Sequence, residues 1–241
     1  MCPLSKNPLA FSFHAAVTFF NLAKKVINMT KEAIMNLNIP VIGILRGVDA
    51  AFFRSVMDAS FASGLQAIEV TMNTEGALQI VSSNRSSVPA GKLLGMGTVR
   101  NLNEAKKAID AGAMFLVTPN TDTAVIEYAG SNSIPVIAGA LTPTEVYTAW
   151  SAGADMVKVF PCGTFGPQYI RELRGPYDQI SLVAVGGVNP DNIRDYFAAG
   201  VRAVGASTSL FGRRALAEQD LEEIGQNVKK FIALCLLPLN P

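Results

Sequence analysis

The sequence predicts an α/β protein that folds as one (β/α)8 TIM barrel with an N-terminal helical extension. Three observations lead to this prediction. The chain has 241 residues, of which 49% are apolar, and about 250 residues is a common size for a single barrel. Eight short apolar runs alternate with helix-like segments, which is typical of parallel strands joined by crossover helices. Four of these units also carry a glycine at the same position before the following strand.

The extension is assigned to residues 1–28, whose composition differs from that of the remaining chain. Residues 9–23 are apolar enough for the core of a signal peptide, but Lys24 and Lys25 follow in place of a small-residue cleavage site. We therefore interpret residues 1–28 as an upstream extension rather than a targeting segment, and residues 29–241 as the barrel. No stretch reaches the roughly 18–20 clean apolar residues of a membrane span, so no membrane partner is expected.

The eight apolar runs are each five or six residues long and are expected to form the barrel strands. A doubly wound open sheet is the alternative, because it is built from the same alternation of strands and helices. In chain order the predicted strands are residues 40–45, 67–71, 92–97, 114–118, 134–139, 156–160, 181–185 and 202–206.

Four glycines come directly before strands and are expected to end the preceding helices in a left-handed conformation. They are Gly64, Gly112, Gly153 and Gly200. Five residues after each glycine stand Glu69, Val117, Lys158 and Gly205, on the second, fourth, sixth and eighth strands. Alternate strands of such a barrel contribute one layer of four interior side chains. Because the second and sixth strands face each other, Glu69 and Lys158 are expected on opposite walls of one cavity.

The composition excludes several classes of function. The formal net charge is +1, from 20 basic and 19 acidic residues, and no basic stripe points to nucleic acid. The three cysteines lie far apart, which predicts no disulfide framework and suits the cytoplasm. The single histidine, His14, lies in the extension, which argues against a zinc site and against histidine-assisted nucleophiles. We expect chemistry based on carboxylates, lysine and backbone groups, with no metal.

Glu69 and Lys158 are charged residues in strands that should be apolar on both faces. A buried charge needs either a partner or a functional cavity. In one interpretation the two residues form an ion pair that braces the barrel. In the interpretation that we favour, burial lowers the pKa of the lysine, whose neutral amine attacks a ketone to form a Schiff base. The facing carboxylate then transfers protons.

Three further residues are candidates for the rim of the site. Arg46 ends the first strand, at the edge where barrel active sites lie, and its guanidinium suits a substrate carboxylate. A surface pair with an acidic neighbour is the alternative. Thr98 is predicted either to hydrogen-bond the substrate or to cap the next helix. Phe160 is predicted either to shield the amine of Lys158 from water or to pack in the core.

Gly186 and Gly187 begin the loop after the seventh strand, and Ser207 and Thr208 follow the eighth strand. Barrels of this kind commonly bind phosphate with the backbone N–H groups of these two loops. Two adjacent glycines also suit an ordinary turn. Their location favours a phosphate site.

From residue 39 to residue 234 the chain resembles the class I 2-keto-3-deoxy-6-phosphogluconate (KDPG) aldolases. The family includes relatives that act on the galactonate epimer or on 4-hydroxy-2-oxoglutarate. The resemblance rests on ILRG, IEVTMNT, GMGTV, TPN, VKVFP, FGPQYI and AVGGV, in the family's order and spacing. It implies that Lys158 is the Schiff-base lysine and Glu69 the general acid and base. It also implies binding of the pyruvyl carboxylate by Arg46 and Thr98 near Pro119, and of phosphate by Gly186, Gly187 and Ser207.

The resemblance implies cleavage of KDPG, or of its galactonate epimer, to pyruvate and glyceraldehyde 3-phosphate by a homotrimer without a cofactor. Asn73 stands where gluconate-type members often have arginine, and Val185 where they tend to have threonine. Both residues, with FGPQYI, are more similar to the galactonate-type branch. The alternatives are cleavage of 4-hydroxy-2-oxoglutarate to pyruvate and glyoxylate, a phosphate-binding barrel isomerase or synthase, and a non-catalytic sensor of phosphorylated sugars.

Overall fold

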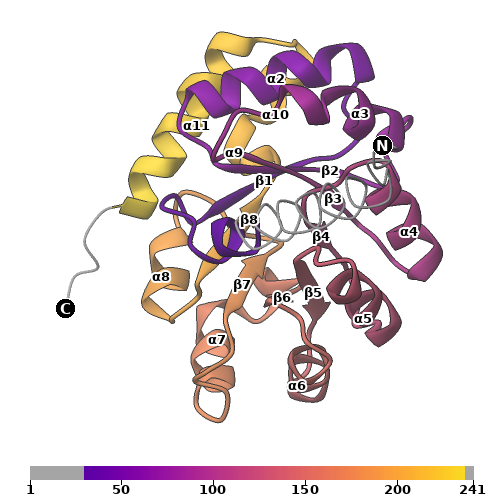
Figure 1. Ribbon diagram of the computed structural model, residues 1–241. Coiled ribbons are helices and arrows are strands. Elements are labelled where there is room, and N and C mark those ends of the chain that lie inside the picture. The colour runs from indigo at the N-terminus through magenta and orange to yellow at the C-terminus, as the bar shows by residue number, and fades with distance from the viewer. Residues whose placement is uncertain (1–29, 237–241) are drawn as a thin grey trace, which may run out of the picture.

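The computed structural model describes residues 30–236, and its eight parallel strands close into a barrel surrounded by helices (Figure 1). The strands follow one another around the barrel in sequence order, and β1 (Val41–Leu45) pairs with β8 (Ala203–Ala206) to close it. This confirms the (β/α)8 prediction, and the open-sheet alternative is wrong. The extension predicted at residues 1–28 lies outside the described residues. No helix within residues 30–236 is long and apolar enough to span a membrane.

All the strands match their predicted positions to within two residues at either end, and β4 is the shortest. Residues 114–118 were expected in this strand, but only two residues are paired as strand, although Met114 and Thr118 still bond to neighbouring strands through their backbone N–H groups. The remaining strands are β2 (Ala67–Thr71), β3 (Leu93–Gly97), β4 (Leu116–Val117), β5 (Val136–Ala140), β6 (Met156–Val159) and β7 (Leu182–Val185).

After β1, ten α-helices and two short 3-10 helices connect or follow the strands within the described chain. Side chains of Asp49, Asn101, Asp122 and Thr142 cap four of the helices by accepting hydrogen bonds from backbone N–H groups. The helices are α2 (Ala50–Ala62), α3 (Ala77–Asn84), α4 (Leu102–Asp110), α5 (Thr123–Ser131), α6 (Pro143–Ser151), α7 (Gly166–Arg174), α8 (Ile193–Ala198), α9 (Thr208–Phe211), α10 (Arg213–Ala217), α11 (Leu221–Leu236), η1 (Arg85–Ser87) and η2 (Cys162–Thr164).

The four repeated glycines adopt the left-handed conformation expected from the sequence. Their φ angles are +106°, +93°, +98° and +95° for Gly64, Gly112, Gly153 and Gly200, respectively. Each glycine follows a helix and precedes a strand, so the same turn sets the start of β2, β4, β6 and β8. Equal turns place residues at equal offsets on the same side of each strand.

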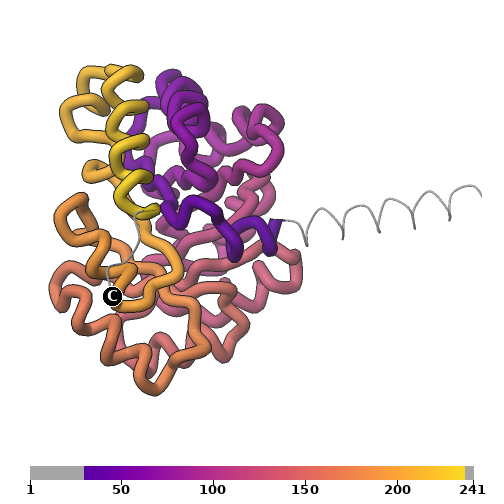
Figure 2. The backbone as a smooth tube through the Cα atoms, turned by 90° about the vertical axis from the view of Figure 1, so that its left-hand side faces the viewer, coloured from indigo at the N-terminus to yellow at the C-terminus, as the bar shows by residue number. Residues whose placement is uncertain are grey.

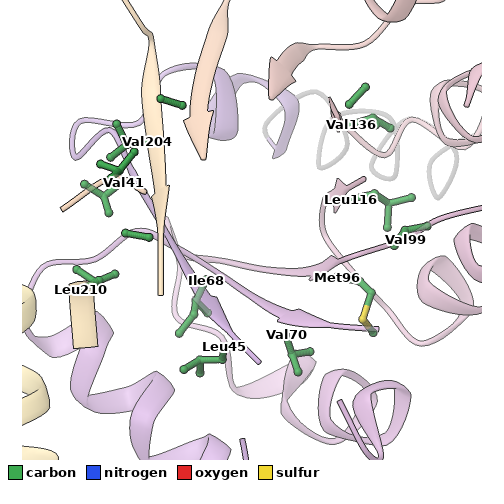
Figure 3. Packing of buried hydrophobic residues seen from close by; sticks show 14 of the residues in the cluster. Val41, Leu45, Ile68, Val70, Met96, Val99, Leu116, Val136, Val204 and Leu210 are labelled. Carbon is green, nitrogen blue, oxygen red and sulfur yellow. The ribbon is translucent and has the colours of Figure 1, made fainter. Parts of the chain in front are cut away.

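Apolar side chains form one core inside the barrel and another between the strands and the helices. Figure 3 shows outward-facing residues of the second core, among them Ile68 and Val70 on the strand that carries Glu69. The inner core contains Val117, and residues 30–35, which are helical, contribute Ile34 to it. Figure 2 shows this first described segment crossing one face of the barrel. The inner core therefore fills part of the barrel interior, and open space remains at the carboxyl ends of the strands.

Candidate active site

A cavity of about 210 Å³ lies at the carboxyl ends of the strands and is formed mainly by residues of β1, β2, β6, β7, β8 and the loops that follow them. Eight of the nine residues predicted for the site line this cavity. They are Arg46, Glu69, Thr98, Lys158, Phe160, Gly186, Gly187 and Ser207. The structure thus brings together residues that are up to 161 positions apart (207 − 46) in the sequence.

Pro119 is the predicted residue that does not line the cavity. Its backbone, with those of Thr118 and Asn120, instead packs against Gly139 on β5, where a Cβ atom would overlap with it. The chain after the short β4 thus passes directly against the neighbouring strand β5. The predicted place of Pro119 near the pyruvyl carboxylate stays a prediction.

Glu69 and Lys158 extend into the barrel from β2 and β6, which lie opposite each other in the ring of strands. Their exposed fractions are 1% and 5%. No salt bridge joins them within the described chain, and Glu69 Oε2 is buried without a hydrogen-bond partner. The interpretation of the two residues as a bracing ion pair is therefore wrong. The predicted placement on opposite walls of one cavity is confirmed.

Burial moves the pKa values of both groups toward neutrality. It raises the pKa of Glu69 from 4.5 to about 7, although the positive charges of Lys158 and Arg46 oppose this shift. Burial also lowers the pKa of Lys158, while Glu69 opposes the shift and Arg46 adds to it. A carboxyl group that titrates near neutral pH can both give and take protons. A lysine with a lowered pKa provides more of the neutral amine, which is the nucleophilic form.

Phe160 covers one side of the lysine. The Nζ atom of Lys158 lies 4.7 Å from the centre of the Phe160 ring, and Phe160 itself is 37% exposed. The ring thus lies beside the amine and lines the same cavity, and its shielding of the amine from water stays a prediction. Packing in the core, the alternative for Phe160, does not agree with this exposure.

Arg46 has neutral partners in place of a carboxylate. Its guanidinium donates to Asn73 Oδ1 at 3.5 Å and to Thr98 Oγ1 at 3.4 Å, and no acidic side chain among the described residues pairs with it. The alternative of a surface ion pair is therefore wrong. Thr98 has a φ of +55° and does not cap α4, because Asn101 does so. With no salt bridge among the described residues, the guanidinium of Arg46 suits an anionic ligand.

The loops after β7 and β8 form another wall of the cavity. Gly186 and Gly187 both have a φ of +86°, a conformation that L side chains rarely adopt. The hydroxyl of Ser209 donates to the Val188 carbonyl at 2.8 Å and ties the two loops together. The N–H group of Gly187 has no hydrogen-bond acceptor within residues 30–236. A donor of this kind beside the hydroxyl of Ser207 suits a phosphate group.

Sequence reasoning assigned no role to Gly97, at the end of β3. A Cβ atom at this position would overlap with the carboxyl group of Glu69, so the absence of a side chain makes room for that group. A glycine inside a strand often marks such a close approach, and this signal was present in GMGTV.

We expect Gly97→Ala to lower kcat about 100-fold, the loss typical of a catalytic group displaced by about 1 Å. Steady-state kinetics would measure the loss. Gly130→Ala is the matched control, because a Cβ atom there meets no other atom within 4 Å. Unchanged kcat in Gly97→Ala would show that Glu69 needs no such room.

The closed barrel and the lysine–carboxylate pair in its cavity are features of an aldolase, a carbon–carbon lyase. Residues 28–227 match the family described as "Aldolase: KDPG and KHG aldolase", and the chain belongs to this family. The probable 2-dehydro-3-deoxy-6-phosphogalactonate aldolase of Rhizobium meliloti (strain 1021) is 36% identical over 174 residues, which are 71% of this chain and 82% of that protein.

A second relative is the 2-dehydro-3-deoxy-6-phosphogalactonate aldolase of Escherichia coli (strain K12). It is 33% identical over 196 residues, which are 80% of this chain and 93% of that protein. A solved structure described as "Native KDPGal structure" superimposes with a TM-score of 0.78 at 31% identity, and covers 83% of this chain and 96% of that one. The sequence comparisons and the structural superposition therefore point to the same family of aldolases.

Proposed function

We propose that the protein is a class I aldolase that cleaves 2-keto-3-deoxy-6-phosphogalactonate to pyruvate and glyceraldehyde 3-phosphate through a Schiff base on Lys158. One observation carries the proposal: the buried Lys158 amine faces the cavity opposite a carboxyl group, with no salt bridge between them. An amine held for structural reasons would be expected to pair with its carboxylate. An amine held for catalysis must stay free to attack a carbonyl carbon.

The reaction begins when the neutral Nζ of Lys158 adds to the C2 ketone of the substrate. The carbinolamine takes a proton from Glu69 and loses water, which leaves an iminium cation. Glu69, now a carboxylate, accepts the proton of the C4 hydroxyl directly or through water, and the C3–C4 bond breaks. Its electron pair neutralises the iminium as an enamine, and glyceraldehyde 3-phosphate leaves. Protonation at C3 and hydrolysis release pyruvate and restore the amine.

The ends of the cavity suit the two anionic ends of this substrate. Arg46, held by Asn73 and Thr98, would bind the carboxylate beside the ketone. Gly186, Gly187 and Ser207 would bind the phosphate at the opposite end.

Two residues support the galactonate epimer as the substrate, because Asn73 and Val185 are both more similar to the galactonate-type branch of the family. Val185 is 6% exposed and lines the cavity directly before the glycine loop, so it offers no hydrogen bond to a hydroxyl group near it. An unpaired hydroxyl in such a place is penalised, and the configuration at C4 decides where the hydroxyl points. The two relatives described above are also aldolases for the galactonate epimer.

We expect the highest kcat/KM with the galactonate epimer when both phosphorylated epimers and 4-hydroxy-2-oxoglutarate are assayed side by side. Val185→Thr should shift the ratio of the two kcat/KM values toward the gluconate epimer by about fivefold, the value of one hydrogen bond of about 1 kcal/mol. Val183→Thr, on the same strand and in the inner core, is the control for a buried valine outside the cavity. A preference for the gluconate epimer in the unaltered protein would contradict the proposal.

The alternatives are less well supported. Family membership does not favour an isomerase or a synthase, and a non-catalytic sensor would have no need for the Lys158 amine. Preferred cleavage of 4-hydroxy-2-oxoglutarate would leave the glycine loop without a phosphate to bind. A cytoplasmic homotrimer stays a prediction.

A further inference from the structure

Directly behind the glycine loop lies a buried hydrogen-bonded chain that the proposed chemistry does not use. Cys162 in η2 and Tyr196 on α8 are each 1% exposed. The thiol of Cys162 donates to the Gly186 carbonyl at 3.1 Å. The hydroxyl of Tyr196 and the thiol of Cys162 interact with each other. Because the thiol proton is directed at Gly186, only the hydroxyl of Tyr196 has a proton to donate between the two side chains.

The Gly186 carbonyl receives a second hydrogen bond from the same side. The N–H group of Gly163, next to Cys162, donates to it at 2.7 Å. The two loops are also in close contact, since a Cβ atom on Gly187 would lie 2.7 Å from the Cα atom of Gly163. The segment after the Lys158 strand therefore holds the first peptide of the glycine loop through two donors.

The orientation of this peptide decides where the next N–H group points. In a planar trans peptide, the Gly186 carbonyl and the Gly187 N–H group point in opposite directions. Because the carbonyl is held against η2, the N–H of Gly187 faces away from η2, and Gly187 lines the cavity. This N–H has no acceptor within the described residues.

Two adjacent glycines do not keep such an orientation by themselves. Their backbone is permissive, so neither sterics nor side-chain packing prevents rotation of the peptide between them. A thiol is a weak donor, but a hydroxyl that donates to its sulfur strengthens the bond that the thiol makes. Burial raises the pKa of both Cys162 and Tyr196, so both keep their protons at neutral pH and remain donors.

We propose that Cys162 and Tyr196 are positioning residues that hold the Gly186–Gly187 peptide with its N–H directed at the phosphate group of the substrate. The inference rests on the proposed function, because it deepens the role of the glycine loop. Cys162 and Tyr196 then increase the affinity for the phosphorylated end of the substrate and take no part in the chemistry at Lys158.

The test compares Cys162→Ala, Cys162→Ser and Tyr196→Phe with the unaltered enzyme. In Cys162→Ala and Tyr196→Phe we expect KM for the phosphorylated substrate to rise about fivefold, the effect of one lost hydrogen bond. Cleavage of 4-hydroxy-2-oxoglutarate and trapping of pyruvate by borohydride should not change, because neither ligand carries a phosphate. Cys162→Ser should restore KM, since a hydroxyl both donates and accepts.

Cys235→Ala is the matched control, because among residues 30–236 the thiol of Cys235 donates to the Phe231 carbonyl within α11, away from the glycine loop. An unchanged KM for the phosphorylated substrate in Cys162→Ala and Tyr196→Phe would overturn the inference. An equal loss with the phosphorylated and unphosphorylated substrates would also overturn it, since it would show a general structural role.

Titration with inorganic phosphate separates this inference from the proposed function. If the unaltered protein does not trap pyruvate, the proposed function fails. Weaker phosphate binding by Cys162→Ala than by Cys235→Ala would still support the positioning role, and equal binding by the two variants would contradict it.

Discussion

Replacing Lys158 with alanine is expected to lower kcat by about 10⁵-fold or more, a loss typical of removing a covalent nucleophile. Without the amine no iminium forms, so the electron pair of the C3–C4 bond has no acceptor. The cavity and its other polar groups remain, and substrate binding is expected to persist. Steady-state cleavage assays measure the first effect, and calorimetric titration with an unreactive substrate analogue measures the second.

Trapping gives the direct test of the Schiff base. Borohydride added with pyruvate should reduce the iminium to a stable secondary amine, so that the peptide containing Lys158 gains the mass of one reduced pyruvyl group. Lys92→Met is the matched control, since burial also lowers the pKa of Lys92 but its amine donates to the Leu65 carbonyl at the other end of the barrel. Pyruvate trapped on Lys158→Ala, or cleavage at the original rate, would rule out this role for Lys158.

Replacing Glu69 with glutamine is expected to lower kcat by about 10²- to 10⁴-fold, the usual contribution of a general acid or base. The amide keeps the shape of the side chain and fills the space beside Gly97, but it cannot exchange protons. Glu127→Gln, on the exposed face of α5, serves as the control and should retain activity. A kcat within threefold of that of the unaltered enzyme would mean that another group, or water alone, moves the protons.

The same variant should change how stability depends on pH. In the folded protein the pKa of Glu69 is about 7, against an ordinary value of 4.5. Between these two pH values the folded state keeps a proton that the unfolded state has lost, so the free energy of unfolding falls as pH rises through this window. Glu69→Gln removes this contribution. Its Tm should therefore fall less between pH 4.5 and pH 7 than that of the unaltered protein.

The repeated glycines explain why so much of the fold and the site could be predicted. A left-handed residue before each of four strands sets a common register, and period-two alternation then decides which side chains point inward. Glu69 and Lys158 follow from that register alone, because both are strand residues at a fixed offset from a glycine. Pro119 lies beyond its strand, where the path of a loop determines position; it does not line the cavity, and its role stays a prediction.

Other features depend on groups that are distant in the sequence. The partners of Arg46 are Asn73 and Thr98, and no pattern around Arg46 distinguishes these neutral groups from an acidic neighbour. Cys162 gave no signal at all, because a single cysteine does not indicate that its thiol meets a loop carbonyl 24 positions away. The space that Gly97 leaves for the carboxyl group of Glu69 likewise depends on a contact between β3 and β2, which lie apart in the sequence.

The sequence by itself determined the barrel, its eight strands, and the placement of a lysine and a carboxylate on opposite walls. Hydrophobic periodicity and turn-forming residues predict these features because they depend only on residues close together in the chain. Only the tertiary structure decided that the two charges form no salt bridge, that Arg46 is free to bind an anion, and that a buried thiol and hydroxyl stand behind the glycine loop. These features are set by distances between residues on different strands and loops, which closure of the barrel brings together.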